Sequence, residues 1–329
     1  MNSKIDLLSC ADFTGMQNNL SAIIDMGTNT FHLLIADQQG DKLKYIYRER
    51  IPVKIGMGGI NQGIITDEAS DRALNAMQVF KQTLDEFEVK QVMAFGTSAL
   101  RNAKNGKAIA DKITEQTGIA IHIISGAQEA EYIFMGARKA IQMGEELNLV
   151  MDIGGGSVEF IIGNKEGISW KQSFEVGGQR LLEKFQKTDP VSEEERSSLY
   201  TYFDEQLIEL KAALNQYQPQ VLIGSSGTFD TLRDIYCKRM GIDKNFDDPE
   251  TPLSVEGFYQ IFDELIHKNR AARLQIPGMI AMRVDMIVVA CCLIDWLLKN
   301  YPLQRVRVST YALKEGALNV LMKTIDVQA

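Results

Sequence analysis

The sequence lacks three things: cysteines spaced for pairing, an apolar run long enough to cross a membrane, and an excess of basic charge. Its four cysteines, Cys10, Cys237, Cys291 and Cys292, show neither a disulfide framework nor a metal-ligand spacing, which predicts a reducing, cytoplasmic environment. The longest apolar run, 284–298, contains two aspartates and is shorter than the ~20 residues that a bilayer requires, so it predicts a buried helix. The net charge of −8 argues against nucleic-acid binding through a broad basic face. We therefore expect neither a nucleic-acid nor a membrane partner.

Low-complexity and linker-like segments are also missing between the two halves of the chain, so the boundary should be a hinge. A length of 329 residues with 45% hydrophobic composition predicts two globular domains. Residues 1–20 show no clear periodicity and are interpreted as an N-terminal extension. We expect the first domain to contain residues 21–127 together with 311–329, and the second to contain 128–310.

One short pattern occurs twice. Residues 25–30 read Asp-Met-Gly-Thr-Asn-Thr and residues 152–157 read Asp-Ile-Gly-Gly-Gly-Ser, each between two apolar runs typical of strands. This predicts a duplicated hairpin with a loop of small residues at its tip. Such loops expose backbone N–H groups and leave room for phosphate oxygens. Two facing copies would clamp an anion and its metal between two domains.

The remaining periodicity predicts alternating strands and helices, which is the pattern of an α/β protein. Thr66 precedes a carboxylate-rich turn and should begin a helix, and Ser192 with Glu195 forms a capping box. The expected strands are 22–36, 42–55, 91–96, 119–124, 149–152, 219–223 and 304–309, and the expected helices are 98–113, 128–142, 192–214, most of 255–300 and a last one from about Tyr311.

Acidic residues at the two hairpins are the first candidates for chemistry. Asp25 and Asp152 each end a buried strand just before its loop, where an Asx-turn is the alternative to metal or phosphate chemistry. Glu159 lies in the apolar strand after the second loop, and it is either a solvent-facing residue of an edge strand or a second oxygen ligand beside Asp152, suited to Mg²⁺. His32 occupies the matching position of the first hairpin and is interpreted as a hydrogen-bonded core residue.

Further candidates lie at predicted helix starts. Glu129 follows a Gly-containing bend, and it either complements the helix dipole or orients a water molecule for attack. Arg101, in the first turn after Thr97 and Ser98, either binds phosphate or pairs with a surface acid. Arg180 and Arg233 are weaker candidates of the same kind, and 224–228 is a third loop of small residues.

Five segments together resemble the Ppx/GppA family of exopolyphosphatases and guanosine pentaphosphate phosphohydrolases, within the acetate kinase, sugar kinase, Hsp70 and actin superfamily. They are Ile23–His32, Gly96–Arg101, Ser125–Ala130, Asp152–Glu159 and Gly224–Thr228, in the order found in that family. The resemblance runs from about residue 22 to the end of the chain. It implies two ribonuclease H-like domains around a central cleft.

The resemblance also implies the roles of individual residues. Glu129 would be the catalytic base, and Asp152 and Glu159 would hold Mg²⁺ or Mn²⁺. The implied phosphate-binding residues are Asp25, Gly27, Thr28, Asn29, Thr30, Arg101, Gly154, Gly155, Gly156 and Ser157, and the possible cleft residues are Thr97, Ser98, Arg180, Gly227 and Thr228. Lys314 stands where relatives usually have Arg, and Lys cannot make the two-pronged contact of a guanidinium.

We therefore expect a cytoplasmic, metal-dependent phosphohydrolase that removes terminal phosphate from inorganic polyphosphate. The alternative within the class is guanosine pentaphosphate, a nucleotide of the stringent response, with the tetraphosphate as a further partner. The alternatives from other classes are a kinase of the superfamily and a sensor that binds guanosine nucleotides or polyphosphate without cleaving them. A homodimer is compatible with any of these.

Overall fold

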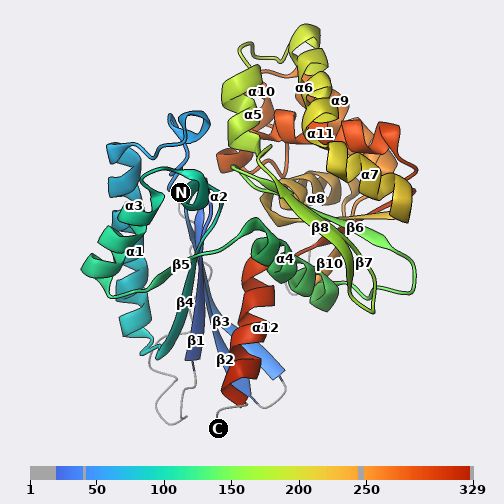
Figure 1. Ribbon diagram of the computed structural model, residues 1–329. Coiled ribbons are helices and arrows are strands. Elements are labelled where there is room, and N and C mark those ends of the chain that lie inside the picture. Colours follow the sequence, from blue (N-terminus) through green and yellow to red (C-terminus); the bar gives the residue numbers. More distant parts are fainter. Residues whose placement is uncertain (1–19, 40–41, 244–247, 327–329) are drawn as a thin grey trace.

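The computed structural model describes residues 20–39, 42–243 and 248–326, and in it each repeated hairpin begins a separate β-sheet (Figure 1). The expected N-terminal extension, with Cys10, lies outside the described residues except for Leu20, which already belongs to the first strand. Among the described residues, no helix is both long and apolar enough to span a bilayer.

The first sheet has the strand order β3-β2-β1-β4-β5. Strand β1 pairs antiparallel with β2 and parallel with β4, so the sheet begins as a meander and continues through crossover helices. Its face away from the second sheet packs on α1 and α3, which form one apolar core with it. The bounds are β1 Leu20–Met26, β2 Phe31–Gln39, β3 Lys42–Ile51, η2 Ile60–Gln62, α1 Asp67–Glu86, β4 Gln91–Gly96, α2 Ser98–Asn102, α3 Gly106–Thr117 and β5 Ile121–Ile123.

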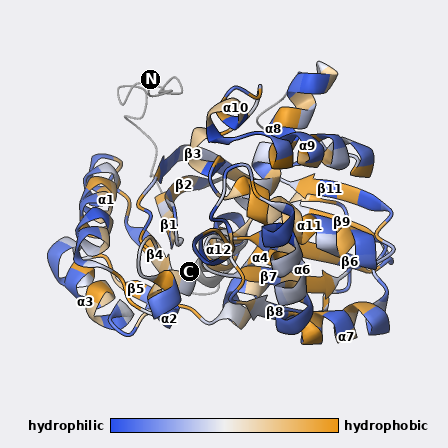
Figure 2. Ribbon diagram, turned by 90° about the horizontal axis from the view of Figure 1, so that it is seen from above, coloured by the Kyte–Doolittle hydropathy of each residue, from blue (hydrophilic) through white to orange (hydrophobic). Residues whose placement is uncertain are grey.

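The second sheet repeats this plan, with the order β10-β11-β9-β6-β7-β8. Strand β6 pairs antiparallel with β7 and parallel with β9. Its outer face packs on α5–α9 and α11, whose apolar residues form one core with it. Figure 2 shows hydrophobic segments alternating with hydrophilic ones in these helices. The bounds are β6 Asn148–Ile153, β7 Val158–Gly163, β8 Ile168–Phe174, α5 Gly178–Phe185, α6 Glu193–Gln206, α7 Ile208–Tyr217, β9 Val221–Ser225, α8 Ser226–Met240, β10 Glu250–Pro252, α9 Val255–His267, α10 Arg270–Leu274, η3 Ala281–Arg283, α11 Ile287–Asn300 and β11 Arg305–Ser309.

Two helices, α4 (Gly126–Ala140) and α12 (Leu313–Asp326), lie between the sheets and belong to a core that both sheets share. Ile23 and Leu34 enter this core from the first sheet, and Val150 and Ile223 enter it from the second. The central strands are thus buried on both faces, which explains their continuous apolar runs. The duplicated antiparallel-then-parallel sheets with helices between them confirm the expected pair of ribonuclease H-like domains. The exact domain boundaries stay a prediction.

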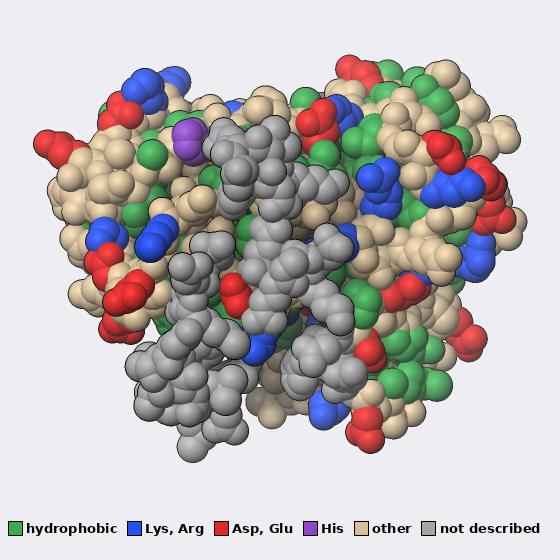
Figure 3. All heavy atoms as spheres, turned by 90° about the horizontal axis from the view of Figure 1, so that it is seen from below, with side chains coloured by type: hydrophobic (Ala, Val, Ile, Leu, Met, Phe, Trp, Pro, Cys, Tyr) green, Lys and Arg blue, Asp and Glu red, His purple; other side chains and the backbone are tan. Residues whose placement is uncertain are grey.

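Several expected elements are confirmed residue by residue. The hydroxyl oxygen of Thr66 accepts a hydrogen bond from the Ala69 N–H and caps α1. The Ser192 capping box begins α6 with both of its hydrogen bonds. The apolar run 284–298 forms α11, whose residues are buried through Leu297. The view in Figure 3 shows acidic and basic side chains interspersed over both domains on the described part of that face.

Three expected elements are wrong in extent. The helix expected at 98–113 is interrupted before Gly106, because the Asn105 side chain is hydrogen-bonded to both backbone groups of Ile65. The helix expected at 192–214 divides at Leu207, which leaves helical geometry while its side chain is fully buried. Strand β3 ends at Ile51 rather than 55, because Pro52 has no N–H for the ladder.

Candidate active site

The two small-residue loops face each other across the domain interface. Gly155 lies so close to the first loop that an added Cβ would overlap Asn29 and come within 3.1 Å of Thr28 Cβ. A Cβ on Gly156 would come within 2.5 Å of Ser98 Oγ and 2.6 Å of Thr28 Oγ1. The glycines of the second loop are therefore required for the close approach of the two domains. The two loops come together in space as the repeat predicts.

Asp25 and Asp152 occupy equivalent positions in the two hairpins. Asp25 pairs in register with His32 across β1–β2, and Asp152 pairs in register with Glu159 across β6–β7. Both members of the second pair are buried, Glu159 to 1% exposure. Strand β7 lies between β6 and β8, so the edge-strand interpretation of Glu159 is wrong. His32 is half-buried in the first pair.

Hydroxyl groups hold the Glu159 carboxylate. Its Oε1 accepts hydrogen bonds from Ser157 Oγ at 2.6 Å and from Ser173 Oγ at 2.7 Å. Ser157 belongs to the second loop, so this carboxylate is tied to the loop that is expected to bind phosphate. The other carboxylate oxygen is left for a further partner.

Glu129 lies in the first turn of α4, the helix between the two sheets. Ser125 and Gln128 cap this helix with a reciprocal pair of hydrogen bonds. The Glu129 carboxylate is buried and accepts a hydrogen bond from Arg101 Nη1 at 2.8 Å. A glutamate that only complements a helix dipole needs neither burial nor a guanidinium partner, so both features favour the catalytic interpretation of Glu129.

Four carboxyl groups from both domains share this region, and each has a raised pKa; Glu129, Asp152 and Glu159 are buried and Asp25 is partly buried. Burial raises the pKa of Asp25 to about 6 and that of Asp152 to about 7. Burial also raises the pKa of Glu129 to about 7, although the Arg101 guanidinium opposes the shift. The pKa of Glu159 is held well above its usual range by burial and then by Glu129 and Asp152. The cluster therefore favours protons or a cation.

The carboxylates of this region fit a divalent cation that takes only part of its ligands from the protein. Across residues 20–39, 42–243 and 248–326, no three His, Cys, Asp or Glu side chains converge as a preformed metal site. Mg²⁺, however, is usually held by one or two carboxylates, with water and substrate phosphate completing its shell. Asp152 and Glu159, paired in register on adjacent strands, offer two carboxylates that could act in this way, and the raised pKa values of the cluster mean that a cation bound there would be favoured.

Of the other predicted residues, Arg180 and several loop residues lie at the site, whereas Thr97 and Arg233 are engaged by other groups of the protein. Arg180 reaches the site, where its Nε donates to the Gly156 carbonyl at 2.8 Å. Thr97 is buried and its hydroxyl donates to the Met26 carbonyl, which indicates a structural role. Arg233 pairs with Asp230 and Asp234 within α8, its own helix. The buried residues Thr28, Asn29, Thr30, Thr228 and Ser157 line or adjoin the loops.

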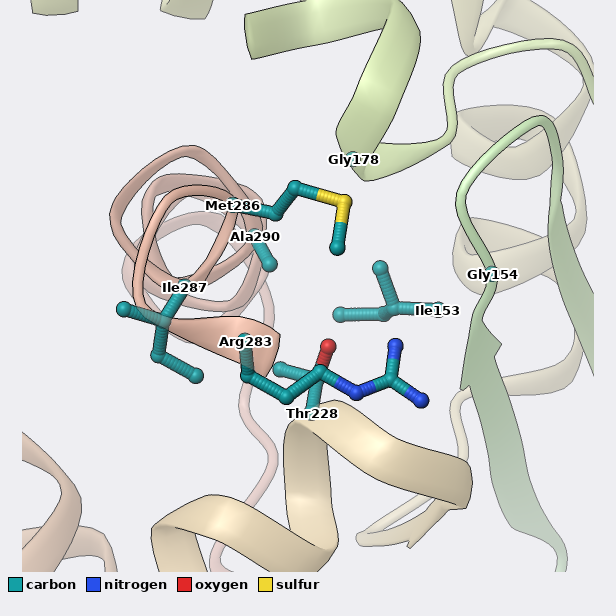
Figure 4. Close-up of a pocket in the computed structure, with 8 residues that line it drawn as sticks. All are labelled: Ile153, Gly154, Gly178, Thr228, Arg283, Met286, Ile287 and Ala290. Atoms are coloured by element: carbon teal, nitrogen blue, oxygen red, sulfur yellow. The ribbon is translucent and has the colours of Figure 1, made fainter. Parts of the chain in front are cut away.

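The expected loop 224–228 is instead the end of β9 and the first turn of α8. A guanidinium covers it: Arg283 packs so closely on Gly227 that a Cβ there would overlap the Arg283 side chain. Figure 4 shows Arg283 between Thr228 and Gly154, with Met286 and Ile153 on the other side of the same small pocket. Burial lowers the pKa of Arg283, and the nearby Asp230 and Asp152 oppose this shift only in part.

Sequence reasoning missed Arg283 and Glu175. Arg283 lies in the region expected to be helical and belongs to no motif, and Glu175 is a single glutamate after a strand. Neither residue is therefore marked by a pattern in the sequence. Lys314, noticed only as a departure from Arg, lies near enough to lower the pKa of both Asp25 and Asp152.

Comparison with known proteins agrees with this geometry. Residues 34–325 match the model of the Ppx/GppA phosphatase family. An exopolyphosphatase from Cytophaga hutchinsonii, known from its crystal structure, shares 45% sequence identity and a TM-score of 0.90, over 93% of this chain and 98% of that one.

Two curated relatives extend the comparison. A Haemophilus influenzae protein named as a candidate exopolyphosphatase is 26% identical over 306 residues, covering 93% of this chain and 92% of its own length. A bifunctional 3-dehydroquinate synthase/phosphatase from Fusobacterium nucleatum is 33% identical over 285 residues, which are 82% of this chain but 42% of that longer protein.

Proposed function

The chain belongs to the Ppx/GppA phosphatase family, and we propose that it removes the terminal phosphoryl group of inorganic polyphosphate by metal-dependent hydrolysis. The observation that carries this proposal is the position of Glu129, a buried carboxylate with a raised pKa beside both small-residue loops. Polyphosphate is favoured over guanosine pentaphosphate because the 45% identical Cytophaga relative is an exopolyphosphatase.

In this mechanism Glu129 orients a water molecule and accepts its proton. The water oxygen forms a bond to the terminal phosphorus, and the bond from that phosphorus to the bridging oxygen breaks, releasing phosphate and a shorter chain. Such a transition state is loose, so positioning and charge neutralisation matter more than a strong base. Arg101, held against Glu129, is placed to contact the same phosphoryl group, and the N–H groups of both loops would bind its oxygens.

Asp152 and Glu159 would hold the divalent cation, Mg²⁺ or Mn²⁺, whose charge neutralises phosphate oxygens when it is bound. Arg283 and Lys314 lie near enough to Asp152 to lower its pKa, and these two cations would meet further phosphates of a chain. The buried thiols of Cys237, Cys291 and Cys292 support the proposed cytoplasmic location.

One assay tests the proposal: phosphate release from polyphosphate of several lengths, compared with guanosine pentaphosphate, with and without Mg²⁺. Release from polyphosphate that requires Mg²⁺ supports it. Release from the nucleotide alone would move the substrate to the runner-up. ATP turnover stimulated by a small acceptor would instead identify a kinase, and binding without release would identify a sensor.

A further inference from the structure

Glu175, directly after β8, joins the two domains at the edge of the active site. Its carboxylate accepts hydrogen bonds from Ser98 Oγ at 2.8 Å and Arg180 Nη2 at 2.9 Å, and it lies 3.5 Å from Arg101 Nη2. Ser98 and Arg101 come from α2 of the first domain, whereas Arg180 comes from α5 of the second. Donors from both domains therefore converge on one carboxylate.

The donors are held in place independently of Glu175. Arg101 directs Nη1 to Glu129 and to the Ile124 carbonyl, and only its Nη2 points to Glu175. Arg180 directs Nε to the Gly156 carbonyl and Nη1 to the Ile60 carbonyl, again leaving Nη2 for Glu175. Two guanidinium groups and a hydroxyl would thus stay oriented toward an anion if the carboxylate moved away.

The exposure of these side chains shows which partner can move. The side chains of Arg101 and Arg180 are 17% and 15% exposed, whereas that of Glu175 is 41% exposed. A carboxylate that reaches the donors from the solvent side makes a weak, displaceable ion pair. A phosphoryl group is the better partner for two guanidinium forks, because it has more charge and more acceptor oxygens.

We propose that Glu175 is an affinity-determining residue that competes with substrate phosphate for Ser98, Arg101 and Arg180. This rests on the proposed function, because the competing ligand is the phosphoryl chain of that substrate. When the substrate binds, its phosphate displaces the Glu175 carboxylate, and the three donor groups then hydrogen-bond to phosphate oxygens. Glu175 thereby weakens substrate binding, and in the closed arrangement described here it links the two domains.

A second interdomain carboxylate provides a matched control. Glu183 of α5 accepts hydrogen bonds from the Gly58 N–H at 3.1 Å and from Gln179 Nε2 at 2.9 Å, and it lies 3.5 Å from Asn61 Nδ2. It links the same two domains as Glu175 through uncharged donors. Glu183→Gln therefore tests the loss of an interdomain contact while Arg101 and Arg180 keep their contacts with Glu175.

The experiment measures tripolyphosphate affinity of the wild type, Glu175→Gln and Glu183→Gln, by calorimetry without metal and as KM for phosphate release with Mg²⁺. We expect Glu175→Gln to lower both Kd and KM about threefold, which corresponds to the energy of an exposed ion pair, and to leave kcat unchanged. The Kd and KM of Glu183→Gln should equal those of the wild type. Glu175→Ala should act in the same direction.

Unchanged or weaker tripolyphosphate binding in both Glu175 variants would overturn the proposal, and so would an equal gain in Glu183→Gln. If the wild type releases no phosphate, the proposed function fails, but the calorimetric Kd still decides whether Glu175 competes with a phosphate chain.

Discussion

Glu129 is set apart from other helix-start glutamates by its burial and by its contact with Arg101. Because burial raises its pKa to about 7, the group changes charge in the range where a general base is most effective. A base must be ionised to accept a proton, and Glu129 is ionised only above its pKa.

We therefore expect kcat/KM for polyphosphate to rise with pH through about 7 and then to level off. The measurement is a pH–rate profile at saturating Mg²⁺, with overlapping buffers to exclude buffer effects. A rate that is flat or falls with increasing pH through this range would contradict the assignment of Glu129 as the base.

The carboxyl cluster makes a separate prediction about stability. Asp25, Asp152 and Glu159 have raised pKa values, so the folded state binds their protons more tightly than the unfolded chain does. The free energy of unfolding should then fall as pH rises from the ordinary carboxyl range to about 7. A bound divalent cation would replace the lost protons.

Mg²⁺ should consequently raise Tm more at about pH 8 than at about pH 5, because the ligands are ionised only at the higher pH. Asp152→Asn and Glu159→Gln should each reduce that shift and raise the Mg²⁺ concentration for half-maximal activity. Glu166→Gln, at the exposed turn between β7 and β8, is the control. Equal Mg²⁺ shifts in all four proteins would remove Asp152 and Glu159 from the metal site.

The pairing of the key carboxylates could be predicted because the repeat implies a hairpin, whereas the chemical roles of the site residues stay predictions. Asp152 and Glu159, seven positions apart in the sequence, face each other across the hairpin as a hairpin requires. Arg283 and Glu175 could not be predicted. Each reaches the site only through tertiary packing, and the local sequence gives no periodicity or spacing that marks it.

At the scale of elements, the contact between α4 and α12 fixes Glu129. The two helices touch backbone to backbone through glycines: a Cβ on Gly316 would overlap the Tyr132 carbonyl oxygen and lie 2.9 Å from the Gly136 nitrogen. Gly136 likewise has no room for a Cβ, because the Ala312 carbonyl is in the way. Helix α12 therefore sets the position of the helix that carries the proposed base.

Gly316→Ala should force α4 and α12 apart and lower the free energy of unfolding by about 1–3 kcal/mol, as other overpacked contacts do. Thermal and denaturant unfolding measure this change, and Gly144→Ala is the control because a Cβ there meets nothing within 4 Å. If both variants unfold like the wild type, the two helices can separate without cost and the packing argument fails.

Element types could be predicted from the sequence more reliably than element ends. The capping residues Thr66 and Ser192 located helix starts correctly, because a cap acts through its immediate neighbours. The interruptions before Gly106 and at Leu207 were missed, because Asn105 is held by the distant Ile65 backbone and Leu207 by the core. Long-range contacts of this kind leave no local pattern.

At the scale of the whole molecule, the two domains are in contact beside the loops. Glu175 of the second domain accepts a hydrogen bond from Ser98 of the first, and Arg180 donates to both Glu175 and the Ile60 carbonyl. Gly155 has no room for even a methyl group beside Asn29, so the two loops leave no space between them at this point. The structure is thus a closed arrangement of the two domains.

We expect solution scattering of the substrate-free protein to show a larger radius of gyration than this closed arrangement gives. Polyphosphate with Mg²⁺ should reduce the radius of gyration, because a ligand favours the state that it contacts most. Arg101→Ala should weaken this compaction by removing one phosphate contact. Scattering curves that match the closed arrangement and do not change with substrate would mean that the domains are fixed.

The central claim, that Glu129 is the base of a polyphosphate hydrolase, is tested most directly by phosphate release from polyphosphate with Mg²⁺ in the wild type and in Glu129→Gln. Gln keeps the volume of the side chain and a hydrogen-bond acceptor for Arg101, but it cannot take a proton from water. We predict that the release rate falls by about 10²–10⁴-fold while substrate affinity is retained. Glu131→Gln, which alters a glutamate of the same helix that pairs with Lys171, should leave the rate unchanged. A Glu129→Gln rate close to that of the wild type would contradict the account.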